Sequence, residues 1–327
     1  MRVLIDTTYA LRGHSGTAVY IDREIAALRA AGVEVVEAAN ERRPPPAGGG
    51  LGSVRNLLTD LRWAKRDLAR YATAAGADLI HHALPAHSPR AGVPQVITVH
   101  DIVFETHPEW FARAFATWAR LAHRRAAARA DAVICVSETT AALVVEFWGV
   151  PPDRIVVAHH GPGQELPQVP PRVPEHVLYV GDDEPRKNLG LLRAAAQRFT
   201  ALPVRIAGRA GEPVDPAALA ELYAGALALV HPSVDEGFGL VPLEAMAAGV
   251  PIVAAVNDAV LEVCGDAALY VPHDDPGELA AVLDRLLAEP DLRADLVRRG
   301  RERVARFDWA ASARGHIEAY ERAMSRY

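Results

Sequence analysis

The sequence lacks the features that mark several large classes of protein. Its only two cysteines, Cys135 and Cys264, lie far apart in 327 residues, which excludes a disulfide framework and a cysteine-based metal site. No apolar run approaches the roughly 20 residues that cross a bilayer, and the opening MRVLIDTTYA is too short for a signal peptide. A net charge of −6 does not indicate nucleic-acid binding. We therefore expect a protein of a reducing cytoplasm, soluble or peripherally bound at the inner face of the membrane.

Lysine is also scarce, because Lys65 and Lys187 are the only two among 35 basic residues. The simplest explanation is a GC-rich genome, which encodes arginine and alanine in preference to lysine. In such a composition, a retained lysine is a candidate for a role that a compact ammonium group performs. The charge is uneven as well, since residues 1–165 carry a net charge of +1 and residues 166–327 carry −7.

Short β-branched runs alternate with longer amphipathic segments along the whole chain. In the first half, strands are predicted at 3–6, 33–37, 78–81, 95–100, 131–137 and 154–159. In the second half, strands are predicted at 176–180, 204–207, 226–230, 251–255 and 268–271. Nearly continuous apolar strands separated by helices are typical of parallel sheets covered on both faces. The pattern predicts an α/β protein with two Rossmann-like, doubly wound domains.

A proline-rich connector separates the two patterns. Residues 161–175, GPGQELPQVPPRVPE, contain five prolines, which predicts a stiff linker and a domain boundary. We place the domains at 1–165 and 166–308. Two such domains form a cleft, and their ligands bind at the carboxyl ends of the strands. The low-complexity stretch at 42–52 is predicted to be a flexible loop rather than a site.

The strongest motif is HPSVDEGFGLVPLEAMAAGVPIVAA at 231–255. Its glycines follow a predicted strand and precede a helix, so backbone N–H groups could face a phosphate at the helix N-terminus. Glu236 lies in the loop and Glu244 about one turn into the helix, and carboxylates are good acceptors for sugar hydroxyls. The combination suggests a nucleotide-sugar site. The alternative is an ordinary glycine-bounded turn with two solvated glutamates.

A second motif, LYVGDDEPRKNLGLL at 178–192, places Arg186 and Lys187 at the start of a predicted helix. Two cations at that end oppose the helix dipole, which is reasonable if an anion binds between them. An arginine fork beside a lysine point charge suits a diphosphate. The alternative is a solvated basic turn that is balanced by Asp182, Asp183 and Glu184.

Two weaker motifs lie in the first half. His100 and Asp101 end an apolar strand, where His100 could donate to a sugar hydroxyl or a phosphate oxygen and Asp101 could orient it. The alternative is a purely structural histidine. In LRGHSGTAVYIDREI at 11–25, Gly13 and Gly16 precede a helix capped by Ser15 or Thr17. That loop is either a close-approach loop for a ligand or a simple helix start.

Residues 110–130 are predicted to form a helix with five arginines and no acidic residue. Phe111, Phe115 and Trp118 share one face, and the opposite face carries Arg113, Arg120 and Arg124. One interpretation is a helix that packs by its aromatics and exposes a solvated basic face. The sharper hypothesis is that this arginine face meets anionic lipid. In that case it acts together with Arg62, Lys65, Arg66 and Arg70.

Together these motifs resemble the family 4 glycosyltransferases of GT-B fold, over nearly the whole chain. Corresponding segments are RGHSGTAVY, His100-Asp101, PEWF, ADAVICVSE, VVAHHGPG, EPRKN and EGFGLVPLEAMAAGVPIVA. The last contains a Glu-x7-Glu signature, which is the most specific of these motifs. The segment at 309–327 resembles the final helix of the family, which crosses back onto the N-terminal domain.

The resemblance implies roles for individual residues. Arg186 and Lys187 would hold the donor diphosphate, Glu236 would contact hydroxyls of the donor sugar, and Glu244 would bind the ribose hydroxyls. His100 would contact the sugar or the diphosphate near the reacting centre. The remaining predicted donor contacts are Gly16 and the backbone N–H groups of Gly237, Phe238, Gly239 and Leu240.

The implied reaction is front-face sugar transfer with retention of configuration. Arg186 and Lys187 would stabilise charge on the leaving diphosphate without a metal ion or another cofactor. EPRKN indicates GDP-mannose as the donor, by resemblance, and a glycan or lipid-linked acceptor is implied. The alternatives are a UDP-sugar donor or, in a different class, a non-catalytic nucleotide-sugar-binding protein.

The sequence departs from the family pattern in its second domain. Between the helix predicted at 188–199 and the strand at 226–230 there is room for only one strand, where the family has two strands with a helix between them. The second domain is therefore predicted to be shortened by one βα unit that normally helps to bind the base. Gly208 and Arg209 are the remaining candidates for that contact.

Overall fold

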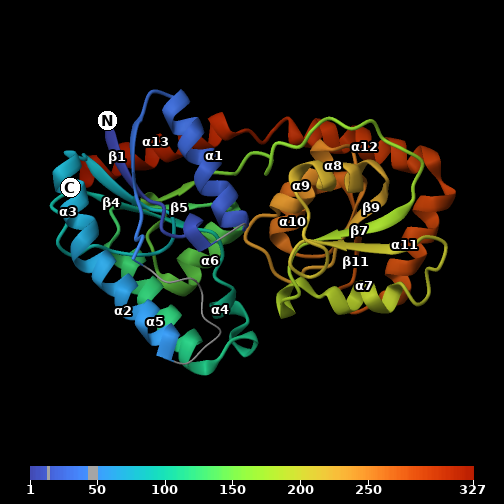
Figure 1. The fold of residues 1–327 in the computed structure, drawn as a ribbon, viewed down its shortest axis with the longest axis horizontal. Coiled ribbons are helices and arrows are strands. Elements are labelled where there is room, and N and C mark those ends of the chain that lie inside the picture. Colours follow the sequence, from blue (N-terminus) through green and yellow to red (C-terminus); the bar gives the residue numbers. More distant parts are fainter. Residues whose placement is uncertain (13–14, 43–50) are drawn as a thin grey trace. The chain divides into compact units, whose positions relative to one another are not determined.

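The computed structural model describes residues 1–12, 15–42 and 51–327, so Gly13 and most of the loop predicted at 42–52 lie outside the described residues. The chain divides into two compact units. The first unit comprises residues 1–160 and 309–327, and the second comprises 161–308 (Figure 1). Residues 161–165, which we assigned to the first domain, therefore belong to the second unit. Figure 1 shows the C-terminal helix, in red, among the blue and cyan elements of the first unit.

Six parallel strands form the sheet of the first unit, in the order β2-β1-β3-β4-β5-β6. They are β1 (Arg2–Asp6), β2 (Glu34–Ala38), β3 (Leu79–His82), β4 (Gln95–Val99), β5 (Ala132–Cys135) and β6 (Ile155–Val157). Every residue of β3, β4 and β5 is buried. A strand that is covered on both faces must be apolar at consecutive positions, which is why the runs were readable in the sequence.

Helices cover both faces of this sheet. They are η1 (Ala10–Arg12), α1 (Gly16–Ala30), α2 (Leu51–Arg62), η2 (Trp63–Asp67), α3 (Leu68–Ala75), α4 (Val103–Thr106), η3 (Pro108–Trp110), α5 (Arg113–Arg129), α6 (Glu138–Trp148), η4 (Pro152–Arg154) and α13 (Trp309–Arg326). Serine caps fix two starts, because Ser15 accepts from the Ala18 N–H at 3.2 Å and Ser137 from the Thr140 N–H at 2.9 Å. Such caps contribute about 1 kcal/mol each.

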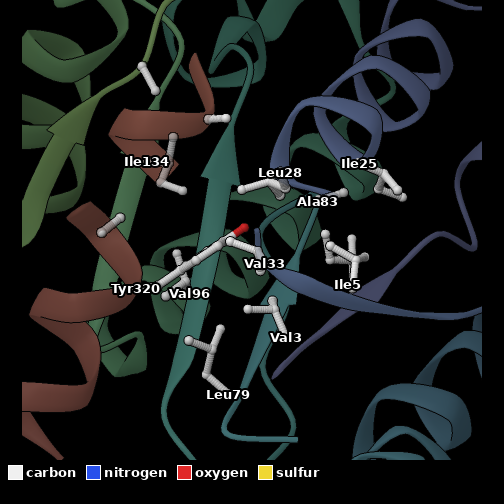
Figure 2. Close-up of a cluster of buried hydrophobic side chains, with 14 of the residues drawn as sticks. Val3, Ile5, Ile25, Leu28, Val33, Leu79, Ala83, Val96, Ile134 and Tyr320 are labelled. Carbon is white, nitrogen blue, oxygen red and sulfur yellow. The ribbon is translucent and has the colours of Figure 1, made fainter. Parts of the chain in front are cut away.

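The main core of the first unit joins α1 and α13 to the strands. Figure 2 shows Leu28 from α1, Val3, Leu79 and Val96 from the strands, and Tyr320 from α13 in one buried cluster. Tyr320 is fully buried, although its ring carries a hydroxyl group. A buried hydroxyl must find a partner, and this one does.

A chain of hydrogen bonds runs through that core. The Tyr320 hydroxyl lies 2.9 Å from His81 Nδ1, and His81 Nε2 lies 2.8 Å from the Thr98 hydroxyl. Thr98 lies 3.0 Å from the Tyr20 hydroxyl, which lies 2.9 Å from His316 Nε2. His316 Nδ1 donates to the carbonyl of Ser312, because a carbonyl only accepts, so Nε2 is the acceptor for Tyr20. Each hydroxyl or ring N–H in the chain then donates to the next group, from Tyr320 through His81, Thr98 and Tyr20 to His316, and every group is neutral.

Glu24 of α1 lies at the His316 end of this hydrogen-bond chain. Ser312 donates to its Oε2 at 2.6 Å, and His316 Nδ1 lies 3.2 Å from its Oε1. Burial raises the pKa of Glu24 to about 8 and lowers the pKa of His316 to about 4. Helix α13 is therefore joined to α1 by neutral hydrogen-bonded groups, whereas its last residue, Arg326, forms an ion pair with Asp153.

Five parallel strands form the sheet of the second unit, in the order β11-β10-β9-β7-β8. They are β7 (His176–Val180), β8 (Val204–Ala207), β9 (Ala226–His231), β10 (Ile252–Ala255) and β11 (Ala268–Val271). Each lies within one residue of its predicted range. Residues 196–225, all of which the structure describes, contain β8 as their only strand, followed by one helix before β9, as expected from the sequence.

The second unit is also covered on both faces. Its helices are η5 (Pro185–Lys187), α7 (Leu189–Ala195), α8 (Pro216–Ala224), α9 (Leu240–Ala247), α10 (Asp258–Cys264), η6 (Gly265–Ala267), α11 (Pro276–Ala288) and α12 (Pro290–Val304). Leu192, Phe199, Leu227 and Leu283 lie in one core cluster that draws on both helices and strands. Residues 161–175 form no helix or strand.

Strand order determines where a ligand can enter the second sheet. The chain moves from β7 outward to β8 and then returns to β9 on the other side of β7. The connections that leave β7 and β9 therefore go to opposite faces and open a crevice beyond the carboxyl ends of these two strands. The two strongest motifs of the sequence follow β7 and β9, so both emerge at this switch point.

Candidate functional site

Arg186 and Lys187 form a short turn after β7. Pro185 starts the 3-10 turn η5, and Asn188 then takes a left-handed conformation with a φ of 49° before α7 begins. The carbonyl of Arg186 accepts from the Val234 N–H at 2.9 Å, which ties this turn to the loop after β9. The backbone thus brings the two predicted motifs together.

Glu236 lies between the two cations. Lys187 Nζ donates to its Oε1 at 2.5 Å, and Arg186 donates to its Oε2 at 3.0 Å. The Glu236 side chain is only 9% exposed, whereas Lys187 and Arg186 are 15% and 23% exposed. The alternative of a solvated glutamate is therefore wrong for Glu236. The basic turn is balanced in part by Glu184, which accepts from Arg186 at 2.9 Å.

His231 completes this cluster, and sequence reasoning missed it. It is the last residue of β9, is 3% exposed, and places Nε2 3.2 Å from Glu236 Oε1. Burial lowers its pKa despite the neighbouring carboxylate. The only available signal was position, because His231 is the last residue of a buried strand at the switch point.

The surrounding charges decide the protonation of Glu236. Burial alone would raise its pKa, but Lys187, His231 and Arg186 together hold the pKa well below its usual range. Glu236 is therefore an ionised carboxylate with two cations beside it. A bound diphosphate could take over these cations and leave the carboxylate to accept hydrogen bonds from hydroxyl groups.

The loop that follows Glu236 supplies backbone donors at the start of α9. Gly237, Phe238 and Gly239 are buried, and Gly239 has a φ of 113°, a conformation that favours glycine. Phe238 anchors the loop by edge-to-face packing on Phe307, with ring centroids 5.9 Å apart. Leu240 is the first residue of α9.

Glu244 lies in the first turns of α9 and is buried. Its Oε1 accepts from the backbone N–H of Gln164 at 2.6 Å, and its Oε2 accepts from the Tyr223 hydroxyl at 3.4 Å. The two glutamates of the Glu-x7-Glu signature therefore differ in their neighbours, because Glu236 contacts cations and Glu244 contacts neutral donors.

Gly208 follows β8 with a φ of 92° and lies against the backbone of Gly181, since a Cβ here would come within 2.9 Å of the Gly181 carbonyl oxygen. Its N–H donates to the carbonyl of Glu212 at 2.9 Å. Arg209 Nε lies 3.5 Å from Asp182. Both residues follow β8, and β8 is the neighbour of β7 in the sheet.

His100 and Gly16 belong to the first unit. Gly16 is exposed and is the first residue of α1. His100 Nε2 lies 3.0 Å from the carbonyl of Ala83, and its ring packs edge-on against Tyr20 at 4.7 Å between centroids. Asp101, which we expected to orient this ring, accepts from the Val103 N–H at 3.3 Å. The partner that orients His100 is the Ala83 carbonyl.

This contact fixes the chemistry of His100. Because a carbonyl only accepts, Nε2 carries the proton and Nδ1 is an acceptor. Burial lowers the pKa of His100 to about 4, so the ring is neutral at neutral pH. We expected His100 to donate a hydrogen bond to a sugar or a phosphate. The Ala83 contact instead leaves Nδ1 as an atom that could accept a hydrogen bond from a hydroxyl group.

The helix predicted at 110–130 packs in the opposite way to our first interpretation. Phe115 and Trp118 are 46% and 42% exposed, whereas Arg120 and Arg124 both lie within 3.0 Å of the buried carboxylate of Glu105. Trp148 also donates to that carboxylate at 3.0 Å. Burial alone would raise the pKa of Glu105, but the hydrogen bonds from Arg124 and Trp148 lower it.

Sequence comparison gives two family matches, one in each half of the chain. The family described as Glycosyltransferase Family 4 matches residues 14–162. The family described as Glycosyl transferases group 1 matches residues 211–303, which include both glutamates of the signature.

Individual relatives are similar at modest identity. The O-antigen chain mannosyltransferase B of Escherichia coli is 27% identical over 298 residues, or 79% of this chain and 76% of that protein. The phosphatidyl-myo-inositol mannosyltransferase of Mycolicibacterium smegmatis is 36% identical over 177 residues, or 46% of each. Among solved structures, a sucrose-phosphate synthase from Thermosynechococcus elongatus superposes with a TM-score of 0.80 at 20% identity, covering 98% of both chains. That likeness shows the two-domain GT-B fold.

Proposed function

We propose that the chain, which matches the Glycosyltransferase Family 4 model over residues 14–162 and the Glycosyl transferases group 1 model over residues 211–303, transfers a sugar from a nucleoside-diphosphate donor to an acceptor hydroxyl with retention of configuration. The observation that carries this proposal is the cluster of Arg186, Lys187 and Glu236 at the switch point of the second sheet. It joins a pair of cations for a diphosphate to an ionised acceptor for sugar hydroxyls.

The donor we propose is GDP-mannose. The EPRKN motif and the similarity to two mannosyltransferases support it. A UDP-sugar is the alternative, because the shortened second unit leaves few residues beyond β8 to select a base. A thermal-shift comparison of GDP, UDP, dTDP and ADP separates the two, since a ligand that binds only the native state raises the melting temperature.

In the proposed reaction the bond between the anomeric carbon and the diphosphate oxygen breaks, and its electron pair stays on that oxygen. The acceptor hydroxyl oxygen bonds to the anomeric carbon on the same face, and its proton passes to the departing diphosphate. Arg186 and Lys187 stabilise the charge that develops on the diphosphate, and preorganised charges of this kind are a major catalytic term. We propose that these cations replace a metal ion, so that EDTA should leave the rate unchanged.

We assign His100 to a donor-sugar hydroxyl. Its neutral ring and its Nε2 contact with Ala83 leave Nδ1 as an acceptor, which suits a hydroxyl and not a phosphate oxygen. Replacing His100 by Phe should raise KM for the sugar nucleotide while leaving the affinity for the free nucleoside diphosphate unchanged. An equal loss for both ligands would place His100 at the diphosphate instead.

The decisive experiment measures release of nucleoside diphosphate from sugar nucleotides, with and without candidate acceptors. Slow hydrolysis of the donor in the absence of acceptor, abolished by Glu236→Ala, is the expected result. Tight binding without turnover across all acceptors would favour a nucleotide-sugar-binding protein. A folded Glu236→Ala variant with near-normal turnover would refute the site.

The arginine face that we expected to meet lipid is turned to Glu105 through Arg120 and Arg124, so we propose instead that the other, exposed face of α5 contacts an anionic membrane that carries a lipid-linked acceptor. Phe115, Trp118 and Leu121 lie on this face with Arg125 and Arg129, and α5 contains no acidic residue. Aromatic residues beside arginines are typical of helices that lie at a membrane interface. The exposed basic residues of η2, α3 and the end of α2 are Arg62, Lys65, Arg66 and Arg70. No described helix is long and apolar enough to cross a bilayer.

Vesicle flotation tests this surface. We expect binding to vesicles that contain phosphatidylglycerol and none to phosphatidylcholine alone, with loss of binding when Phe115, Trp118 and Leu121 are changed to Ser. The matched control changes three exposed apolar residues of the second unit, Val173, Val256 and Leu261, to Ser. Absence of the native protein from both kinds of vesicle would contradict the proposal.

A further inference from the structure

The segment that enters the second unit, residues 161–164, lies directly against the carboxylate of Glu244. The N–H of Gln164 donates to Oε1 at 2.6 Å. This is a contact between residues 80 positions apart in the sequence, so neither the connector nor the Glu-x7-Glu signature indicates it alone.

Gly163 leaves the space that this contact needs. A Cβ at residue 163 would lie 2.4 Å from Glu244 Oε1 and 3.1 Å from its Cδ. Real Cβ atoms do not approach so closely, so any side chain would displace the carboxylate. The requirement is for space alone, because Gly163 is not among the glycines with a positive φ.

Tyr223 holds the other carboxylate oxygen. It is the penultimate residue of α8, is buried, and donates its hydroxyl to Glu244 Oε2 at 3.4 Å. Burial and the adjacent charge of Glu244 raise the pKa of Tyr223 well above its ordinary value, so the hydroxyl keeps its proton. Like the Gln164 N–H, Tyr223 is a neutral donor, which orients a carboxylate without cancelling its charge.

We propose that Gly163, the Gln164 N–H and Tyr223 position Glu244 to accept the ribose hydroxyls of the donor nucleotide, and so set the affinity for a ribonucleotide over an analogue without that diol. The inference rests on the proposed function, because it takes a nucleoside diphosphate as the ligand. Hydrogen bonds from a diol to a rigidly placed carboxylate are sensitive to displacements well below 1 Å. Residues that act through Glu244 should therefore affect only the ribose contribution to binding.

The test compares two ligands on matched variants by calorimetry. The ligands are GDP or UDP, whichever binds the native protein more tightly, and its 2′,3′-dideoxy analogue. We expect Gly163→Ala to weaken the ribonucleotide about tenfold, or about 1.4 kcal/mol, and to leave the dideoxy analogue unchanged. Gly190→Ala is the control, because nothing lies within 4 Å of a Cβ at that position, and it should change neither ligand.

Tyr223→Phe supplies a second variant that keeps the shape of the ring. It should weaken the ribonucleotide about threefold and spare the dideoxy analogue. An equal loss for both ligands, or no loss in either folded variant, would overturn the positioning role. If the native protein binds neither ligand, the proposed function itself fails, and if Lys187→Ala weakens both ligands while Gly163→Ala weakens neither, only this inference fails.

Discussion

Each unit of the molecule buries a cluster of ionisable side chains. The cluster in the first unit is neutral, whereas the cluster in the second unit is ionised. In the first unit, burial keeps Glu24 protonated and His316 neutral, and they are joined to the sheet through hydroxyl groups. In the second unit, Glu236 is also largely enclosed but ionised, because Lys187 and Arg186 lie beside it.

The difference follows from the partner, not from the depth of burial. Removing a charge from water costs several kcal/mol, and at Glu236 the opposite charges of Lys187 and Arg186 at close range compensate for it. The first unit contains its own example, since the buried Glu105 lies beside Arg120 and Arg124 and has a lowered pKa. A protein that only needs to hold a helix in place can use neutral groups, whereas a site for a charged ligand must keep its charges.

The largest expected effect comes from removing a cation from the second cluster. Lys187→Ala should lower kcat/KM by about 10³-fold, since preorganised charge at the leaving group is lost and the remaining carboxylate repels the diphosphate. Steady-state rates with saturating acceptor measure the effect. Arg193→Ala is the control, because Arg193 is a half-exposed cation of the adjacent helix α7. Near-normal turnover by Lys187→Ala would contradict the assignment.

Lys187→Arg sharpens this result within the same assay. The Lys187 ammonium lies 2.5 Å from Glu236 Oε1, and the Lys187 side chain is only 15% exposed. A guanidinium is larger and planar, so it fits this position less well. We expect a rate between those of the native protein and Lys187→Ala. A fully active Lys187→Arg would show that charge alone suffices, and that arginine could have served here as it does elsewhere in the chain.

The second prediction concerns the neutral cluster and pH. The pKa of His100 and His316 falls from 6.5 to about 4 on folding, so the unfolded chain binds more protons in that range and stability falls as the pH drops below about 6.5. The pKa of Glu24 rises from 4.5 to about 8, so stability falls as the pH rises towards 8. The two histidines outweigh Glu24 below pH 6.5, and Glu24 acts alone above it.

The first unit should therefore be most stable near pH 6.5. At about 1.4 kcal/mol per pKa unit, we expect a loss of about 2 kcal/mol at pH 8 and a larger loss at pH 4.5, because burial also lowers the pKa of His81, His123 and His160. Native-state hydrogen exchange of α13 amides measures it, because α13 carries His316. Glu24→Gln should remove the alkaline decline and keep the acid one. A variant that keeps both would place the alkaline group elsewhere.

The third prediction tests whether a cation keeps Glu105 ionised. Arg124→Ala should destabilise the protein by about 2 kcal/mol, because a hydrogen-bonded charge partner is lost from a buried carboxylate. Arg125→Ala is the matched control, because Arg125 is the next residue of the same helix and is exposed. This substitution should change stability by less than about 0.5 kcal/mol. Urea denaturation compares them. Equal values would mean that α5 packs in the way first interpreted from the sequence.

The smallest effect comes from cutting the neutral chain. Tyr20→Phe removes the link between Thr98 and His316 and should cost about 1–2 kcal/mol of unfolding free energy. Tyr71→Phe, at a half-exposed tyrosine of α3, should be neutral in the same denaturant series. A neutral Tyr20→Phe would indicate that its two partners find other hydrogen bonds.

Much of the fold could be predicted because strands buried on both faces require consecutive apolar residues. β7, β8 and β11 begin and end at the predicted positions, and the single strand between α7 and β9 agrees with the short chain length predicted there. The Arg186–Lys187 and Glu236 motifs were predicted separately. Their meeting follows from the strand order, because β7 and β9 are neighbours at the switch point.

Other parts of the site could not be predicted, because they depend on which neighbour a side chain reaches. Periodicity placed Phe115 and Arg124 on opposite faces of α5 but could not say which face turns inward, since the buried Glu105 that selects the arginine face comes from another element. In the same way, the Ala83 carbonyl sets the tautomer of His100, and Glu244 sets the need for Gly163.

By itself, the sequence determined the succession of strands and helices and the chemistry of each motif, because these depend on local residue pattern. The tertiary structure decided which charges survive burial. Glu24, Glu105 and Glu236 are all glutamates in buried settings, and the sequence does not distinguish them. Only folding brings arginine or lysine to two of them and serine to the third. Charges a few ångströms apart interact strongly enough to decide whether a buried glutamate is ionised, but residues that are this close in space are far apart in the sequence.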